Sequence, residues 1–469
     1  MSAASTTAAS SARGILAPLA LAQFICSFAG SNMNVMINDI SDDLDTTVKG
    51  VQTTITLFLL IMAVLMIPCS KLTDRYGRKR CFMAGLALYG VGAVLSAVSP
   101  GLGVLILGNS VFEGVGTALL IPPVYILATL AFTDVTSRAR AFGVISGAGG
   151  IGAAAGPLIG GVITTGISWR AAFIFQALII VTIILLSRRL EDPLPPDPTR
   201  HFDTVGAILS AVGMFFLVFG ILQAQTDAVL FVVFVAVGLA LLIGFFFYIR
   251  GREREGKEAL LSTDVFKNRT SNLGLATQNI QWLLLMGTSF VVAVFLQTVR
   301  EFNAIKTGVI FTAATLGILV SSLAAERLAK RHEQRTLIRT GFVVTIAGIG
   351  LLIGFVGSSD NVWAFVPGLL VFGLGVGVML TPSVNVVQSS FPEQKQGEIS
   401  GLSRSVSNLG SSFGTAIAGT LLVSDLASGN RAYALAMAVL AVLALIGLAA
   451  ALLLPGQPRA VGRPAAEAA

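Results

Sequence analysis

A single carboxyl group stands in the middle of one of the most apolar stretches of the sequence. Glu113 lies about eleven residues into the apolar segment 102–130, which places it roughly 16 Å along a helix. If that segment spans a bilayer, an ionisable group at this depth is expected to be functional. A proton that binds there and leaves on the other side would let the chain use a proton gradient. The alternative is a permanently protonated glutamic acid that hydrogen-bonds to a neighbouring helix.

A strongly basic loop follows the apolar segment 49–69. It reads Ser70-Lys71-Leu72-Thr73-Asp74-Arg75-Tyr76-Gly77-Arg78-Lys79-Arg80. Gly77 permits a tight turn, and Asp74 can interact with a helix N-terminus. The cations can pair with carboxylates of neighbouring helix ends and so hold one state of a gate. We therefore predict a gating set, with a plain cationic anchor on one membrane face as the alternative. Its members are Lys71, Asp74, Arg75, Gly77 and Arg78.

A glycine-rich run lies in the apolar segment 139–165. Its regularly spaced members are Gly152, Gly156, Pro157, Gly160 and Gly161. Glycines four residues apart let two helices approach closely, and a proline bends its helix. Ordinary helix packing is the alternative to a functional role for this run.

Other polar residues fall inside the apolar segments, where each one either lines a cavity or bridges two helices. Those that we predict to line a substrate cavity are Asn32, Asn34, Asn109, Gln278, Gln281, Asn385 and Gln388. Arg404 is expected to snorkel to the inner interface, because it lies near the end of its segment. The two histidines and three cysteines form no cluster typical of a metal site. Without a phosphate-binding loop or catalytic triad, the sequence predicts no enzyme, no ATP use, no metal and no cofactor.

The elements that position these residues must be membrane-spanning helices. Of the 469 residues, 54% are hydrophobic and 12% are charged, whereas a soluble domain has about 25% charged residues. Fourteen apolar segments are long enough to span a bilayer, and the first is too long for a signal peptide. They are 15–38, 49–69, 82–99, 102–130, 139–165, 169–187, 204–223, 228–248, 272–299, 305–326, 337–357, 361–389, 398–424 and 432–454.

The distribution of charge predicts the orientation of these spans. With the N-terminus inside, all but five of the 31 lysines and arginines fall on the inner side or at its helix ends. This is the asymmetry of the positive-inside rule, so both termini are expected in the cytoplasm. The net charge of +7 then reflects membrane orientation, and we expect no binding to nucleic acid.

A pattern of glycines and prolines repeats along the chain. The first set is Gly114, Gly116, Pro123, Gly143, Gly152, Gly156 and Gly161, and its copy is Gly373, Gly375, Pro382, Gly401, Gly410, Gly414 and Gly419. We interpret this as two homologous six-helix halves, 14–188 and 272–455, of an all-α polytopic membrane protein. Residues 189–271 then hold linkers and a two-helix insert, while 1–13 and 456–469 are cytoplasmic tails. Parallel repeats of this kind are typical of a large class of transporters.

Three of these features resemble the major facilitator superfamily. The basic loop is similar to its G-x-L-a-D-R-x-G-R-K/R-x loop, with Ser70 in place of the first glycine. The string G-x-x-x-G-P-x-x-G-G, from Gly152 to Gly161 and followed by Trp169-Arg170, resembles the antiporter signature of its drug-exporting branches. Fourteen spans with a central insert resemble the fourteen-span drug:proton antiporters. The resemblance covers residues 14–455.

Two positions depart from that family pattern. Asn32 stands where the family usually has an aspartate in the first span. Asn109 stands at the arginine position of the fourth-span motif, and Glu113 at its glutamine position. The usual acid and arginine are therefore both absent, and an acid appears one helical turn away from the arginine position.

The resemblance implies a proton-coupled exporter of hydrophobic or amphipathic small molecules that works by rocker-switch alternating access. It implies a location in a bacterial cytoplasmic membrane and function as a monomer, with Glu113 as the proton-coupling residue. The two departures leave an alternative within the same fold, a lipid or metabolite exporter or facilitator with non-standard ion coupling. A membrane-embedded enzyme or sensor would need a catalytic cluster or a soluble domain, and neither is evident in the sequence.

Overall fold

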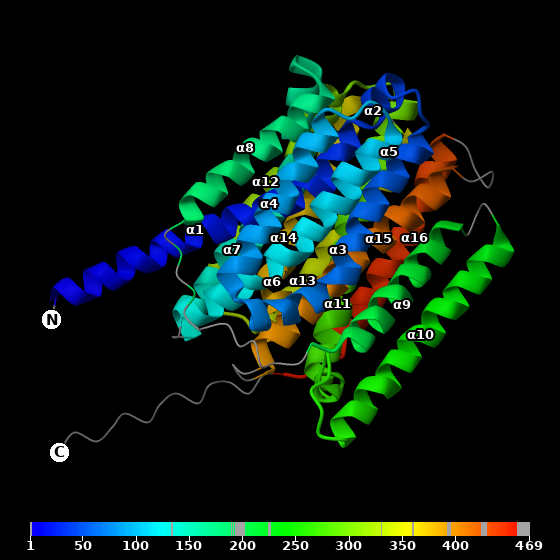
Figure 1. The fold of residues 1–469 in the computed structure, drawn as a ribbon. Coiled ribbons are helices and arrows are strands. Elements are labelled where there is room, and N and C mark those ends of the chain that lie inside the picture. The colour runs from blue at the N-terminus through cyan, green and yellow to red at the C-terminus, as the bar shows by residue number, and fades with distance from the viewer. Residues whose placement is uncertain are drawn as a thin grey trace.

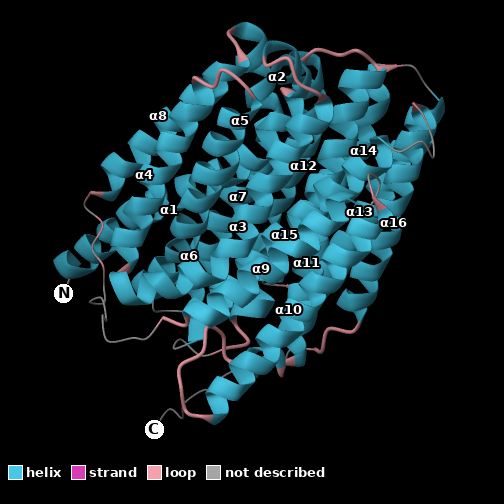
Figure 2. Ribbon diagram, turned by 45° about the vertical axis from the view of Figure 1, so that its right-hand side comes forward, coloured by secondary structure: helices cyan, strands magenta, loops and turns pink. Residues whose placement is uncertain are grey.

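The computed structural model is an elongated bundle of helices (Figures 1 and 2). It describes residues 2–132, 135–188, 190, 192, 202–223, 227–329, 331–358, 361–391, 395–423 and 429–456. Within these ranges, all regular secondary structure is helical. Helices satisfy their own backbone hydrogen bonds, which is what a chain this apolar requires inside a bilayer.

The first six long helical units form the N-terminal bundle. In chain order its elements are α1 (Ser2–Asn32), η1 (Met33–Val35), α2 (Ile37–Asp43), α3 (Val48–Tyr76), α4 (Arg78–Ala97), α5 (Leu102–Leu105), η2 (Ile106–Glu113), α6 (Gly114–Ala131), α7 (Val135–Gly166) and α8 (Trp169–Ser187). The elements α5, η2 and α6 follow one another without a break, and η2 is π-helical.

The last six long helical units form the C-terminal bundle, and two helices separate it from the first. The pair is α9 (Thr204–Gln223) and α10 (Ala228–Arg254), followed by η3 (Thr263–Phe266). The C-terminal bundle comprises α11 (Arg269–Val294), η4 (Phe295–Val299), α12 (Ala304–Ala329), α13 (Gln334–Ser358), η5 (Val362–Ala364), α14 (Phe365–Gln388), α15 (Gln396–Val423) and α16 (Asn430–Leu452).

Each of the fourteen predicted segments coincides with one of these helical units. Twelve helices in the described part of the chain are long and apolar enough to cross a membrane. The helix α7 adds a thirteenth if its two parts, which meet at an angle of 43°, count as one span. The bend falls between Ala153 and Ala155, next to the carbonyl of Ala153, which lacks its helical partner because Pro157 has no N–H. The remaining unit, α15, is rich in serine and is not among the twelve, so the count of fourteen spans is compatible with the structure.

The two-helix insert lies on the outside of the bundle. Figure 1 shows α9 next to the main body and α10 beyond it, and α9 contacts both α3 and α15. Much of the apolar surface of α10 is exposed, including Val229, Val232 and Phe247. Such a surface suits contact with lipid chains.

The glycine repeat of the sequence corresponds to equivalent helix contacts. Gly152 of α7 meets the carbonyl of Phe24 in α1, and Gly410 of α15 meets the carbonyl of Asn279 in α11. In the same way, Gly116 packs on the backbone of α4 at Tyr89, while Gly375 packs on the backbone of α13 at Thr345. These paired contacts support the division into two halves, whose boundaries stay a prediction.

Candidate functional site

A small cavity lies between the two bundles. The empty space there is about 410 Å³, a volume that includes open solvent. Its walls come from α1, α3 and α6 on one side and from α11 and α15 on the other. The apolar part of the lining includes Leu59, Met62, Ile121, Trp282 and Met286, and the polar part includes Gln23, Ser27, Thr117, Arg404, Asn408 and Ser411.

Arg404 supplies a positive charge in this lining. Its prediction was wrong: the side chain does not reach the interface but is buried, with a residue exposure of 4%. The helix α15 begins at Gln396, so Arg404 lies about 12 Å along the helix axis. Its guanidinium carbon lies 4.2 Å from the centre of the Tyr125 ring. The Nε and Nη2 atoms have no hydrogen-bond partner.

A short chain of hydrogen bonds positions the aromatic ring under this guanidinium. The hydroxyl of Tyr125 donates to Oε1 of Gln23 at 3.2 Å, and Nε2 of Gln23 donates to Oγ of Ser27 at 3.2 Å. Since Gln23 and Ser27 belong to α1 and Tyr125 to α6, the chain connects two helices of the N-terminal bundle. Arg404 of the C-terminal bundle therefore stacks on a tyrosine fixed by the opposite bundle.

Glu113 is fully buried, as its place in the sequence predicts, but it faces α4. Its carboxyl oxygens accept hydrogen bonds from Ser96 of α4 and from Asn109, each at 3.4 Å. Gly92 of α4 makes room for it, because a methyl group there would lie 2.8 Å from Cγ of Glu113. Glu113 is not among the residues that line the central cavity, whereas Thr117, one turn further along, is. Its coupling role stays a prediction.

The seven predicted cavity residues are distributed over several helix contacts. Asn32 and Asn34 are fully buried near the end of α1, and neither side-chain amide has a hydrogen-bond partner. Gln278 accepts from Ser403 at 2.8 Å, and Gln388 exchanges hydrogen bonds with Ser400. These last two pairs bridge helices.

The other members of the set lie in comparable places. Gln281 is buried in α11, Asn385 is half-buried in α14, and Asn109 contacts Glu113. None of the seven is among the residues lining the described cavity. Asn408 and Arg404 do line it. Like the seven, each is a polar residue inside an apolar segment, so the sequence does not distinguish the residues that line the cavity from those that do not.

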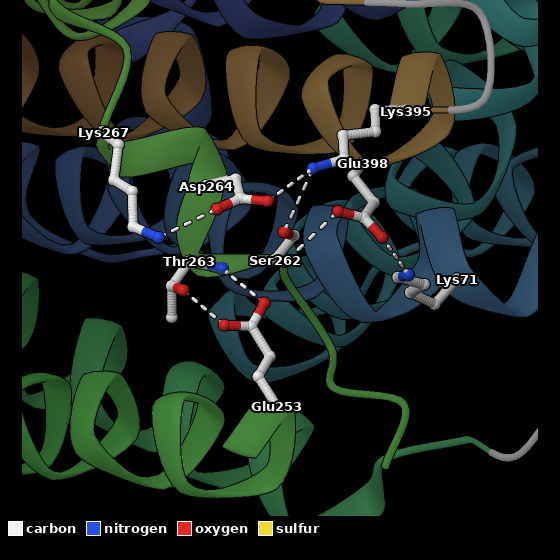
Figure 3. A network of polar contacts seen from close by, with 8 residues as sticks. All are labelled: Lys71, Glu253, Ser262, Thr263, Asp264, Lys267, Lys395 and Glu398. Carbon is white, nitrogen blue, oxygen red and sulfur yellow. Dashed lines mark hydrogen bonds and ion pairs between the residues drawn. The ribbon is translucent and has the colours of Figure 1, made fainter. Parts of the chain in front are cut away.

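The basic loop contacts the C-terminal bundle through an ion pair. Nζ of Lys71 lies 2.7 Å from Oε1 of Glu398, at the start of α15 (Figure 3). The second oxygen of Glu398 accepts from the backbone N–H of Ser262, in the segment that follows the insert, at 3.2 Å. One carboxylate therefore joins both bundles and this segment.

The other gating residues have different roles. Gly77 has φ of 95°, in the region that favours glycine, and separates α3 from α4. The N-terminus of α4 is capped by Asp192, whose Oδ2 accepts from the N–H groups of Arg78 and Lys79 at 2.6 and 3.2 Å. Arg75 lies over the ring of Tyr76. The side chain of Asp74 lies outside the part of the chain that the structure describes.

Further polar contacts attach the segment after the insert to its neighbours (Figure 3). Asp264 is 3.0 Å from both Lys267 and Lys395, the latter just before α15. The hydrogen bonds from these two ammonium groups lower the pKa of Asp264. The carboxylate therefore stays charged down to a lower pH than an ordinary aspartate does. Glu253, in α10, accepts from the backbone N–H of Thr263 at 2.7 Å. The insert is thus attached to the same end of the bundles as the Lys71–Glu398 pair.

The glycine run of α7 packs against both bundles. Gly152, Gly156 and Gly160 lie against Phe24, Ser31 and Asn32 of α1, while Gly161 meets the carbonyl of Ala304 in α12. On the same side, Gly308 of α12 meets the carbonyl of Pro157. The run is therefore one of the places where the two bundles touch closely.

The end of the interface away from Lys71 is also bridged. Gln297 of η4 donates from Nε2 to the carbonyl of Asn34 at 2.7 Å, and Ile305 donates from its backbone N–H to Oγ1 of Thr165 at 3.2 Å. Contacts between the bundles thus exist on both sides of the central cavity.

Two helical bundles that repeat one another and enclose a polar cavity define the class, a polytopic transporter. The chain's family follows from its sequence. The model of the Major Facilitator Superfamily matches residues 19–251 and 279–469, so the chain belongs to this superfamily.

Its relatives include transporters of bacteria. The puromycin resistance protein pur8 of Streptomyces alboniger is 27% identical over 405 residues, which make up 85% of this chain and 80% of that protein. The multidrug efflux pump LfrA of Mycolicibacterium smegmatis is 27% identical over 410 residues, 87% of this chain and 80% of that one. These names agree with the drug-exporting branch that the motifs resemble.

The fold itself has a solved counterpart. The human organic anion transporter MFSD10 (TETRAN) superposes with a TM-score of 0.63 over 94% of this chain and 99% of its own, at 14% identity. At this identity, the match shows the shared fold.

Proposed function

We propose that this chain is a proton-coupled exporter of hydrophobic or amphipathic small molecules that works by alternating access in a bacterial cytoplasmic membrane. The observation that carries the proposal is the cavity between the bundles, which has a polar and an aromatic lining and is bridged by contacts at both of its ends. Such a site is accessible from one side when the bundles rock in one direction and from the other side when they rock back. The names of the bacterial relatives support export of drug-like compounds.

In this proposal the Lys71–Glu398 pair holds the cytoplasmic side closed. Both termini lie in the cytoplasm, the basic side of the chain, and the monomer is the transporting unit. Glu113 takes up and releases the proton, and movement of α6 against α4 exposes its carboxyl group in one of the states. The carboxyl group is buried and accepts hydrogen bonds from Ser96 and Asn109. Because a charge is costly inside the membrane, the group is stable when neutral and needs such a movement to ionise.

Transport by reconstituted protein tests the proposal. We expect liposomes that contain the purified protein in inverted orientation to accumulate at least one compound from a panel of cationic and anionic amphipathic drugs when an inward-acid pH gradient is imposed. Puromycin, the compound in a relative's name, is one of the cations of this panel. A protonophore should abolish the accumulation, and protein-free liposomes give the baseline. Accumulation that persists with the protonophore would contradict proton coupling, and its absence with every compound of the panel would contradict export.

The position of Glu113 favours a second candidate, a facilitator or metabolite exporter with non-standard coupling. Its carboxyl group faces α4 instead of the cavity, so a substrate in the cavity does not contact it directly. A facilitator would exchange labelled for unlabelled substrate across liposomes at equal rates with and without a gradient. The gradient would accelerate transport by an exporter, so this measurement separates an exporter from a facilitator.

A further inference from the structure

We propose that Arg404 is the anchor for an anionic group of the transported compound, so that the central cavity selects amphipathic organic anions. This inference rests on the proposed transport function and specifies its substrate class. It starts from the environment of one guanidinium group, which is buried in the wall of the cavity and has two nitrogen atoms without a hydrogen-bond partner.

No protein carboxylate in the described part of the chain forms an ion pair with Arg404. Glu113, the carboxyl group buried in the neighbouring span, is held instead by Ser96 and Asn109 on the side of α4. A buried cation without a counter-charge is strongly unfavourable, so such a group is expected to find its partner in a ligand. An arginine keeps its charge in this setting, because its guanidinium does not lose its proton in proteins.

The edge of the guanidinium has no hydrogen-bond partner, and its Nε and Nη2 atoms are covered in this state, so the bundles must move apart for a ligand to reach them. One face is covered by the Tyr125 ring at 4.2 Å, and Tyr125 is itself held by Gln23. Stacking on a ring leaves the N–H groups at the edge free to form two parallel hydrogen bonds. A carboxylate, sulfonate or phosphate matches this pattern. A cationic drug would be repelled at the same place.

The other residues that line the cavity indicate the chemistry of the rest of the ligand. Asn408 and Ser411 lie one and two turns further along α15 and can hydrogen-bond to it, while Trp282, Met286 and Ile121 are apolar. An aromatic or aliphatic body with one acidic group would match the chemistry of both parts of the lining. The shared chemistry is an organic anion with an apolar body, whether it is a drug, a metabolite or a lipid fragment.

A pair of probes that differ only in charge tests the inference. Dansylglycine carries a carboxylate, and dansylglycinamide has the same fluorophore without it. We expect the protein in nanodiscs to bind dansylglycine at least about tenfold more tightly than the amide, and Arg404→Gln to remove this preference. Arg404→Lys should retain part of it. Arg431→Gln, which removes an exposed arginine, should leave it unchanged.

Stability separates a binding role from a structural one. If Arg404 serves to bind a ligand, its charge has no partner in the ligand-free protein. The unfolding temperature of Arg404→Gln should then equal or exceed that of the wild type, because an unpaired buried charge has been removed. Dansylglycine should raise the unfolding temperature of the wild type and not that of Arg404→Gln. The inference is overturned if the wild type does not bind dansylglycine, if it binds both probes equally, or if folded Arg404→Gln keeps the preference.

The outcomes for transport are distinguishable from these. Failure of gradient-driven accumulation for every compound of the panel, dansylglycine included, with the charge preference in binding intact, would contradict the proposed export and leave the anion site standing. Gradient-driven accumulation without any charge preference would support the proposed export and contradict the anion site at Arg404.

Discussion

Two buried ionisable residues lie in the membrane-spanning helices on opposite sides of the bundle interface, and their surroundings differ. Arg404 faces the cavity and lacks hydrogen-bond partners for two of its nitrogens, whereas Glu113 faces α4 and has two donors. The depth of Glu113 could be predicted from its place in the segment 102–130. The direction in which either side chain points could not, because an apolar segment with little amphipathic pattern does not reveal which face meets lipid, another helix or a cavity.

Replacing Glu113 by glutamine tests its role at the residue scale. Glutamine keeps the size of the side chain; its oxygen can accept from Asn109 and its NH2 group can donate to the hydroxyl of Ser96, so the fold should survive. If Glu113 carries the proton, Glu113→Gln should lower gradient-driven transport by at least about tenfold while exchange of labelled substrate without a gradient continues. Glu301→Gln, at an exposed carboxylate, serves as the control. Unchanged gradient-driven transport in Glu113→Gln would assign the carboxyl group a purely structural role.

At the scale of elements, the helices follow from apolar length, while the contacts at the Lys71 end of the bundles do not. The loop motif indicated a gate, but its acidic partner, Glu398, is 327 residues away from Lys71 in the sequence. The cap of α4 likewise comes from Asp192 and not from a residue of the loop. Such pairs are set by how the helices assemble, and no local pattern encodes them.

The glycine contacts of α7 give a prediction for a whole helix. A methyl group at Gly152 would collide with the backbone carbonyl of Phe24, which cannot rotate away, so α7 and α1 would have to separate. We expect Gly152→Ala to destabilise the protein by about 1–3 kcal/mol and to impair transport. Gly147→Ala, on the same helix and with open space at the Cβ position, should be neutral or stabilising by up to about 1 kcal/mol. Thermal unfolding in one detergent compares them, and equal effects would mean that the close approach of α7 to α1 is unimportant.

At the scale of the whole molecule, the repeated glycines indicated two equivalent halves, and the contacts at Gly152 and Gly410 or at Gly116 and Gly375 correspond as that repeat requires. The sequence did not reveal how the insert is used. Its linking segment shares Glu398 with Lys71 and Asp264 with Lys395, so the insert is attached to the end where the bundles are proposed to part.

Cross-links between the bundles, placed at each end of their interface, test whether both ends open during transport. One pair is Lys71 and Glu398, and the pair at the opposite end of the interface is Thr165 and Ile305. Each pair is changed to cysteine in a chain whose buried native cysteines, Cys26, Cys69 and Cys81, are replaced by serine. Because each end has to open once in every cycle, a short reducible cross-linker at either pair should lower transport by at least about tenfold, and a reductant should restore it. Variants with one cysteine of each pair should transport at the same rate before and after treatment with the cross-linker; for Lys71→Cys and Glu398→Cys this rate is measured without the ion pair. Undiminished transport with one end cross-linked would mean that this end does not open, and the alternating-access mechanism would have to be abandoned.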